Sequence, residues 1–314
     1  MKIAVIGTFQ VGKSTLVNCL INDAIAGVGN GVATTHVLNY FKGGRSPNIL
    51  CRDISGKCIY ESDLSDDIYK SDLSDENCNI SIPDGTVRIM YELASENNIL
   101  KDNILIDTPG LDAAGKDASW DSIHTSDIIR DNSVDLLLLV VPNSQLDDSI
   151  KKRVLPLIKE SKKQVIVLMN CYKNNPDPNS RQNLETAMAI DDELREAGIR
   201  HSSICEESES KVLSCNVAWW WIAQCQYKKW HWGNLHTREA FQECSLQAQN
   251  YFKLLFGNSA VSNETFKQKS NVSKLFSFLN DDELRERLWE LYHTHLYRSQ
   301  IKDALMKKMK EKHI

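Results

Sequence analysis

The sequence GTFQVGKS at residues 7–14 constrains the fold of this chain more than any other feature, because it fits the pattern GxxxxGK[ST] in full. The apolar run before it, residues 2–6, predicts a buried strand, and the apolar spacing over 12–21 predicts a helix. A strand, a glycine-rich loop and a helix in this order form a phosphate-binding loop. Its glycines let successive backbone N–H groups point at phosphate oxygens, and the helix turns the positive end of its dipole toward them.

Two side chains of this loop have specific roles in such a site. Lys13 is placed to reach the β- and γ-phosphates of a nucleotide, and Ser14 offers its hydroxyl to Mg²⁺. We therefore expect the loop to contact the nucleotide through Gln10, Val11, Gly12, Lys13, Ser14 and Thr15.

Two further segments carry residues suited to the same chemistry. In NILIDTPG at 103–110, Asp107 ends a predicted strand and can hold Mg²⁺ through water, and Gly110 can present its N–H to the γ-phosphate. Thr34 and Thr35 precede a strand, and a threonine in such a loop can ligate Mg²⁺ only when the γ-phosphate is present. This dependence predicts a nucleotide switch, but the spacing leaves open which threonine serves.

The order of strands and helices predicts the fold class. Strands are expected at 2–6, 36–42, 48–52, 58–60, 86–93, 103–107, 134–141, 164–169 and 211–213. Helices are expected at 12–21, 117–131, 146–160 and 180–197. Alternating strands and helices of this length predict an α/β fold of the P-loop NTPase type, with a mostly parallel sheet and helices on both faces.

The chain beyond Asn216 has a helical pattern. The stretch 217–256 is rich in tryptophan, which we expect to pack an added helical layer against the sheet, and a ligand cage or lipid contact is the alternative. Residues 281–314 predict one amphipathic helix that ends in several lysines. These lysines suit the dipole at a helix C-terminus, and a membrane surface or an acidic protein partner is the alternative interpretation.

Composition narrows the function further. A formal net charge of -5 disfavours nucleic acid as the main partner, and the nine cysteines include no CxxC pair that would indicate a zinc or redox motif. The segment before residue 7 is too short for a signal peptide, and no apolar run is long enough to span a bilayer. We expect a cytoplasmic protein, and a peripheral location at a membrane is the alternative.

The motifs together resemble known GTPases. The phosphate-binding loop, the threonine pair and Asp-Thr-Pro-Gly resemble, in this order, the translation-factor-related class of GTPases. More narrowly, GTFQVGKSTLVNCL at 7–20 is similar to the bacterial dynamin-like G domain, and the resemblance covers roughly residues 1–216. It implies GTP/GDP as ligand, GTP hydrolysis, a requirement for Mg²⁺, and a homodimer or a related GTPase as partner across the nucleotide face.

The resemblance also implies a domain organisation. Residues 270–279 resemble the last helix of many GTPase folds. We therefore expect one G domain over 1–280 with a helical insertion at about 217–268. The helix 281–314 would then pack on this domain or extend from it.

The base-recognition motif of the resemblance, [NT]KxD, is only partly present. Asn170 matches, but Lys173 stands where a carboxylate would accept hydrogen bonds from guanine, and a lysine has only donors. Asp177 nearby is a candidate substitute, and the choice between guanine and adenine stays open. Ser214-Cys215-Asn216 resembles the final loop that backs the base.

The position after Gly110 is also unusual. Leu111 stands where Ras-like proteins have a glutamine that orients the attacking water, which leucine cannot do. Gln10, the backbone of the threonine loop or a partner subunit must then position the water, so we expect slow turnover that self-association accelerates. Two alternatives remain, a ribosome- or RNA-associated GTPase and a nucleotide-binding module with little hydrolysis.

Overall fold

The structure is a computed structural model of the 314-residue chain. The residues that it describes are 1–22, 25–26, 37–63, 83–94, 98–110, 118–172, 175–204, 210–225, 242, 245–251, 253 and 262–281.

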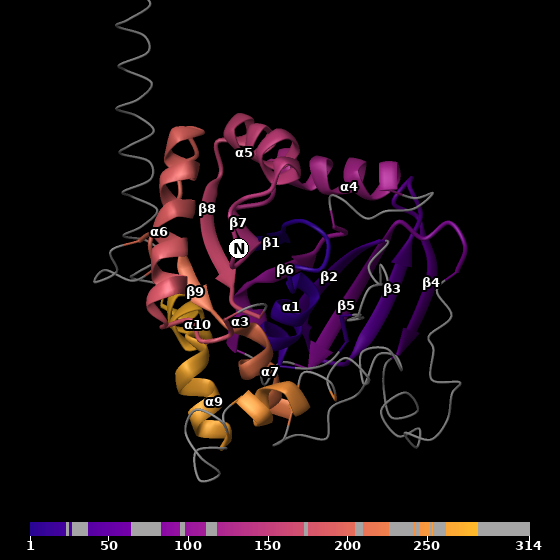
Figure 1. The fold of residues 1–314 in the computed structure, drawn as a ribbon. Coiled ribbons are helices and arrows are strands. Elements are labelled where there is room, and N and C mark those ends of the chain that lie inside the picture. Colours follow the sequence, from indigo (N-terminus) through magenta and orange to yellow (C-terminus); the bar gives the residue numbers. More distant parts are fainter. Residues whose placement is uncertain are drawn as a thin grey trace, which may run out of the picture.

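The described strands form one twisted sheet in the order β4-β3-β5-β2-β6-β1-β7-β8-β9 (Figure 1). Their bounds are β1 Lys2–Ile6, β2 Leu38–Gly44, β3 Asn48–Arg52, β4 Cys58–Asp63, β5 Arg88–Ala94, β6 Ile104–Asp107, β7 Leu136–Pro142, β8 Gln164–Asn170 and β9 Leu213–Cys215. β1 lies between β6 and β7 and is parallel to both, and β7, β8 and β9 continue in parallel. β2 is antiparallel to β6, and β3 is antiparallel to both β4 and β5.

The central strands are buried on both faces. Every residue of β8 and all but the last of β7 are buried. Their sequences are runs of apolar residues without alternation, because a strand covered by helices on both sides has no solvent-facing side. The prediction of a mostly parallel sheet covered on both faces is confirmed.

Helices cover both faces of this sheet (Figure 1). They are α1 Lys13–Ile21, α3 Asn98–Asp102, α4 Ala118–Arg130, α5 Leu155–Ser161, α6 Arg181–Glu196, α7 Val217–Cys225, α9 Asn263–Ser270 and α10 Val272–Asn280, with a π-helical turn η1 at Ile150–Val154. Side chains of α1, α3, α7 and α10 share one core cluster with the sheet. Those of α4, α5 and α6 share the cluster on the other face.

Several predicted bounds differ from the structure by two or three residues, and two of the differences have a clear physical cause. The helix expected over 146–160 is split into η1 and α5, since Pro156 lacks the N–H that would continue the i→i−4 ladder. β9 begins at Leu213 and not at residue 211. The N–H groups of Lys211 and Val212 bind the side chains of Asp191 and Ser210, so they do not enter a strand ladder.

The described tryptophans are part of the protein interior. Trp219, Trp220 and Trp221 on α7 are all buried, and Trp220 stacks on Phe276 of α10 with ring centroids 5.0 Å apart. α7 packs between α1 and α9. The packing interpretation is confirmed for these three residues, while Trp230 and Trp232 lie outside the described residues. The helix expected over 281–314 also lies outside them except for Asp281, which ends α10 in an extended conformation. Among the described helices, none is long and apolar enough to cross a membrane.

Candidate functional site

The loop between β1 and α1 has the conformation that its glycines permit. Gly7 has φ +153° and Gly12 has φ +93°. A Cβ atom at Gly7 would lie 2.4 Å from the carbonyl oxygen of Val140, and one at Gly12 would lie 2.4 Å from Nδ2 of Asn170. Neither position accepts a side chain, because both the backbone conformation and the neighbouring atoms exclude it.

Lys13 lies inside this loop. Its side chain is 93% buried (7% exposed), and Nζ donates a hydrogen bond of 2.8 Å to the carbonyl oxygen of Thr8. Burial lowers the pKa of Lys13 to about 8, although the nearby carboxylate of Asp107 acts in the opposite direction. A desolvated cation enclosed by a loop of backbone N–H groups is suited to bind a phosphate anion.

Ser14 and Asp107 form an oxygen pair next to this lysine. Ser14 Oγ donates to Asp107 Oδ2 over 2.8 Å, and Asp107 is fully buried at the end of β6. Thr108 donates from Oγ1 to the carbonyl of Val5 over 2.8 Å, which ties the end of β6 to β1. A hydroxyl and a carboxylate are the hard oxygen ligands that Mg²⁺ prefers, so this pair fits a magnesium site.

Gly110 lies directly against the phosphate-binding loop. A Cβ atom at Gly110 would lie 2.8 Å from Cα of Phe9 and 3.0 Å from its backbone nitrogen. Because these are backbone atoms, they cannot move aside as a flexible side chain would. The structure thus brings Gly110 beside the loop, and the bond from its N–H to the γ-phosphate stays a prediction.

Asn170 connects the loop to the next part of the site. Its Nδ2 donates to the carbonyl of Val11 over 3.0 Å, and its Oδ1 accepts from the N–H of Val217 over 3.2 Å. The residue is 3% exposed, so these bonds form away from water. Asn170 therefore holds three segments together, which are the phosphate-binding loop, the end of β8 and the start of α7.

Tyr172 makes a second contact to the loop, which was not predicted from the sequence. Its hydroxyl donates to the carbonyl oxygen of Gln10 over 2.7 Å. The signal for it is the period of two in an extended segment, which places residues 170 and 172 on one side and residue 171 on the other. Cys171 is fully buried, and its N–H donates to the carbonyl of Cys215 over 2.7 Å.

The segment Ser214-Cys215-Asn216 lies beside the end of β8. Asn216 Nδ2 donates to the carbonyl oxygens of Cys171 (2.6 Å) and Pro176 (2.9 Å), and its Oδ1 accepts from the N–H of Trp219 (3.0 Å). Ser214 and Cys215 belong to β9, so the prediction that the loop begins at Ser214 is wrong. All three side chains are buried, which leaves backbone groups as their means of contact with a ligand.

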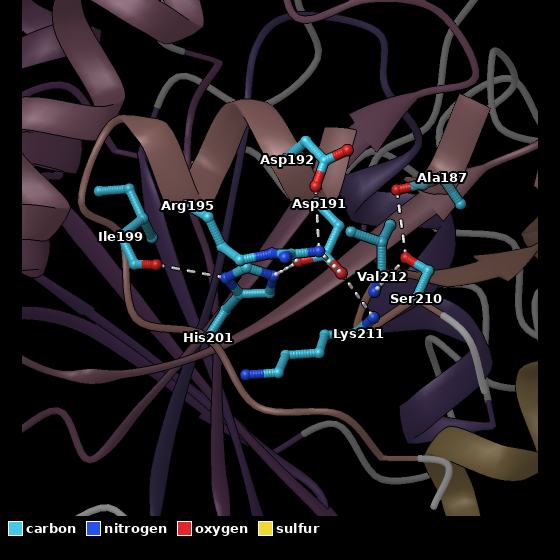
Figure 2. Close-up of polar contacts among 9 residues, drawn as sticks. All are labelled: Ala187, Asp191, Asp192, Arg195, Ile199, His201, Ser210, Lys211 and Val212. Carbon is cyan, nitrogen blue, oxygen red and sulfur yellow. Dashed lines mark hydrogen bonds and ion pairs between the residues drawn. The ribbon is translucent and has the colours of Figure 1, made fainter. Parts of the chain in front are cut away.

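A buried carboxylate on α6, that of Asp191, binds the chain just before β9 (Figure 2). Asp191 is 2% exposed and accepts from Arg195, from the N–H of Lys211 (3.1 Å) and, through Oδ1, from His201 Nε2 at 2.8 Å. Ser210 binds the N–H of Val212 and the carbonyl of Ala187 on α6. The start of β9 is thereby fixed to α6.

The pKa values of Asp191 and His201 are both lowered, for different reasons. Desolvation alone would raise the pKa of Asp191, but the hydrogen bonds that it accepts from Arg195 and Lys211, together with His201, lower it overall. Burial lowers the pKa of His201 against the opposing effects of the Ile199 carbonyl and Asp191. Asp191 is therefore held ionised and His201 is held neutral near pH 7.

Several predicted site residues cannot be placed. Thr34, Thr35, Leu111 and Lys173 lie outside the described residues. Asp177 is described, and its Oδ1 accepts the N–H of Asn179 over 3.0 Å in the turn before α6. Gln10 is exposed, and Thr15 is half-buried in the first turn of α1.

Comparison with known proteins bears on the whole arrangement. A model of the dynamin family matches residues 3–171. No curated protein matches the chain. Two solved chains, from an oligomerised bacterial dynamin pair described as sensing and tethering membranes at long range, are 17% and 14% identical to it, with TM-scores of 0.46 and 0.43. The FeoB G-domain from Methanococcus jannaschii is 15% identical, with a TM-score of 0.30.

The coverage of these structures is uneven. The bacterial dynamin matches cover 98% and 86% of this chain but 45% and 36% of their own length, so the chain spans less than half of either. The FeoB match covers 78% of this chain and 97% of that domain. Because all three TM-scores are below 0.5, the assignment rests on the family model alone. The wider translation-factor-related class stays a prediction.

The matched residues include much of the described site, whereas Tyr172 and residues 214–216 lie beyond the match. The phosphate-binding loop, Asp107, Gly110 and Asn170 all lie between residues 3 and 171. This match spans more than half of the 314 residues, and the chain therefore belongs to the dynamin family.

Proposed function

We propose that this chain is a Mg²⁺-dependent GTPase, which binds GTP and hydrolyses the bond between its β- and γ-phosphates. The observation that carries the proposal is the Ser14 hydroxyl, 2.8 Å from the carboxylate of Asp107 and next to the buried Lys13. A dynamin G domain implies guanine nucleotide as the ligand.

Each residue on the phosphate side has a role in this proposal. Lys13 binds the β- and γ-phosphates as a cation, and the N–H groups of the loop bind their oxygens. Ser14, Asp107 and either Thr34 or Thr35 hold Mg²⁺, which when bound neutralises charge on the phosphates. Gly110 donates its N–H to the γ-phosphate, and its close approach to Phe9 supports this role.

The base side is proposed to contact the purine. Asn170, Lys173 and the backbone of 214–216 surround the base in this proposal, and Asp177 is the candidate carboxylate for guanine. Because Lys173 cannot accept hydrogen bonds from guanine, discrimination against adenine is weaker than a carboxylate would give.

Turnover is proposed to be slow in the isolated chain. Leu111 cannot orient water, so the exposed Gln10, the backbone of the Thr34–Thr35 loop or a partner subunit must do so. We infer that a second copy or a related GTPase completes the site across the nucleotide face. A nucleotide-binding module with little hydrolysis is the second candidate, which the leucine at 111 favours.

The domain organisation and the role of the C-terminal helix are also part of what we propose. We propose one G domain over 1–280 with an insertion at about 217–268, followed by the helix 281–314. That helix would contact a membrane surface or a protein partner. The protein itself is proposed to be cytoplasmic and peripheral at a membrane.

Binding of fluorescent GTP and ATP with Mg²⁺ tests the proposal. The wild-type chain should bind GTP, and Lys13→Ala should abolish this binding because the phosphates lose their cation. Lys152→Ala removes an exposed lysine, paired with Asp148 on the surface, and is the matched control that should bind normally. Equal GTP binding by Lys13→Ala and wild type would contradict the proposed site.

A further inference from the structure

Two side chains at the end of β8 bind neighbouring carbonyl groups of the phosphate-binding loop. Asn170 Nδ2 lies 3.0 Å from the carbonyl oxygen of Val11, and the Tyr172 hydroxyl lies 2.7 Å from that of Gln10. These residues are 159 and 162 positions away from their partners in sequence. The end of β8 therefore holds the loop at two consecutive peptide groups.

A hydrogen bond to a peptide carbonyl also orients the N–H of the same peptide. The peptide group is planar and trans, so its C=O and N–H point in opposite directions. The bond from Tyr172 to the Gln10 carbonyl thus sets the direction of the Val11 N–H. The bond from Asn170 to the Val11 carbonyl likewise sets that of Gly12.

The backbone of Gln10 has an unfavourable conformation that a hydrogen bond to its carbonyl can stabilise. Its φ is +59°, in the left-handed region that a residue with a side chain seldom adopts. Such a conformation persists where surrounding groups determine it. Tyr172 supplies a charge-free donor at this point, and its ring is only half-buried, so its hydroxyl is not part of the hydrophobic core.

We propose that Tyr172 is a positioning residue for phosphate binding, which acts by fixing the Gln10–Val11 peptide so that its N–H faces the nucleotide phosphates. This inference rests on the proposed function, because it assumes that the loop binds phosphate. Cys171 cannot take this role, since its side chain is fully buried in the core and its N–H binds the carbonyl of Cys215 on β9.

The test is Tyr172→Phe in the full chain, which removes the hydroxyl and keeps the ring. Titration with GDP and with IDP should show affinities about fivefold weaker than wild type, because one hydrogen bond contributes about 1 kcal/mol. The factor should be the same for both nucleotides, since they differ only in the base. The melting temperature of the nucleotide-free variant should fall by no more than about 3 °C, since one exposed hydrogen bond contributes at most about 1 kcal/mol to stability.

Tyr60→Phe on β4 is the matched control, and it should bind as wild type does. Unchanged affinity of Tyr172→Phe would overturn the inference, as would a loss confined to GDP, which would indicate a contact with the base. A fall in melting temperature well beyond about 3 °C would also overturn it, because the weaker nucleotide binding would then follow from a general loss of stability. In these cases binding by wild type, lost in Lys13→Ala, leaves the proposed function standing, whereas a wild-type chain that binds neither nucleotide removes both.

Discussion

The phosphate side and the base side of the site are built in different ways. On the phosphate side, residues 7–14 and 107–110 depend on backbone shape, with glycines where a Cβ atom would collide with backbone or side-chain atoms. On the base side, residues 170–172 and 214–216 are held by side chains that bind backbone groups of distant segments. The backbone conformation of the first side follows from its own glycines, whereas the second is held by side chains from the sheet and from α6.

The two sides meet at Gly12 and Asn170. A Cβ atom at Gly12 would lie 2.4 Å from Asn170 Nδ2, which is the atom that binds the loop. A substitution at this single position should therefore damage both sides at once.

Gly12→Ala should cause the largest loss of nucleotide affinity, because it affects both sides of the site. The added methyl group both opposes the φ of +93° and displaces the Asn170 amide, so nucleotide affinity should fall by more than about 100-fold. Gly56→Ala is the matched control, because Gly56 has φ +82° but nothing within 4 Å of an added Cβ. It should cost about 1 kcal/mol in unfolding free energy and leave binding unchanged. Equal binding by both variants in fluorescence titrations would show that contact with Asn170 is unimportant.

A smaller effect is expected at the base side, where the protonation of His201 should make the free energy of unfolding depend on pH. His201 faces Asp191, Arg195 and Lys211, and its pKa is lowered by burial. Because the folded state binds the His201 proton less tightly than the unfolded state, stability is full above the ordinary histidine pKa of about 6.5 and falls as pH decreases below it. Asp191 does not contribute in this window, since its lowered pKa makes its contribution fall only below about 3.8.

Denaturant unfolding at pH 7.5 and pH 5.5 measures this effect. The wild-type chain should lose about 1 kcal/mol between the two values, and His201→Gln should lose less. The remaining loss would include His124, whose pKa is also lowered by burial. An identical loss in His201→Gln would show that this histidine does not titrate in the unfolding transition.

The difference between the two sides explains what the sequence could predict. The phosphate-binding loop, Asp107 and Gly110 were predictable because short contiguous patterns and buried strands determine their positions. Tyr172 and the Asp191–His201 cluster were not, since their partners lie far away in sequence. The period of two after β8 indicates on which side of the chain Tyr172 lies, but not which residue it contacts. The start of β9 was misplaced for the same reason, as the N–H groups of Lys211 and Val212 bind side chains outside the strand.

The most direct test of the central claim is GTP hydrolysis by the purified wild-type chain in Mg²⁺ and in excess EDTA. We expect slow release of phosphate that requires Mg²⁺ and is absent in Lys13→Ala. Its rate per protein molecule should rise with protein concentration. Phosphate release that persists in EDTA, or that is unchanged in Lys13→Ala, would contradict it.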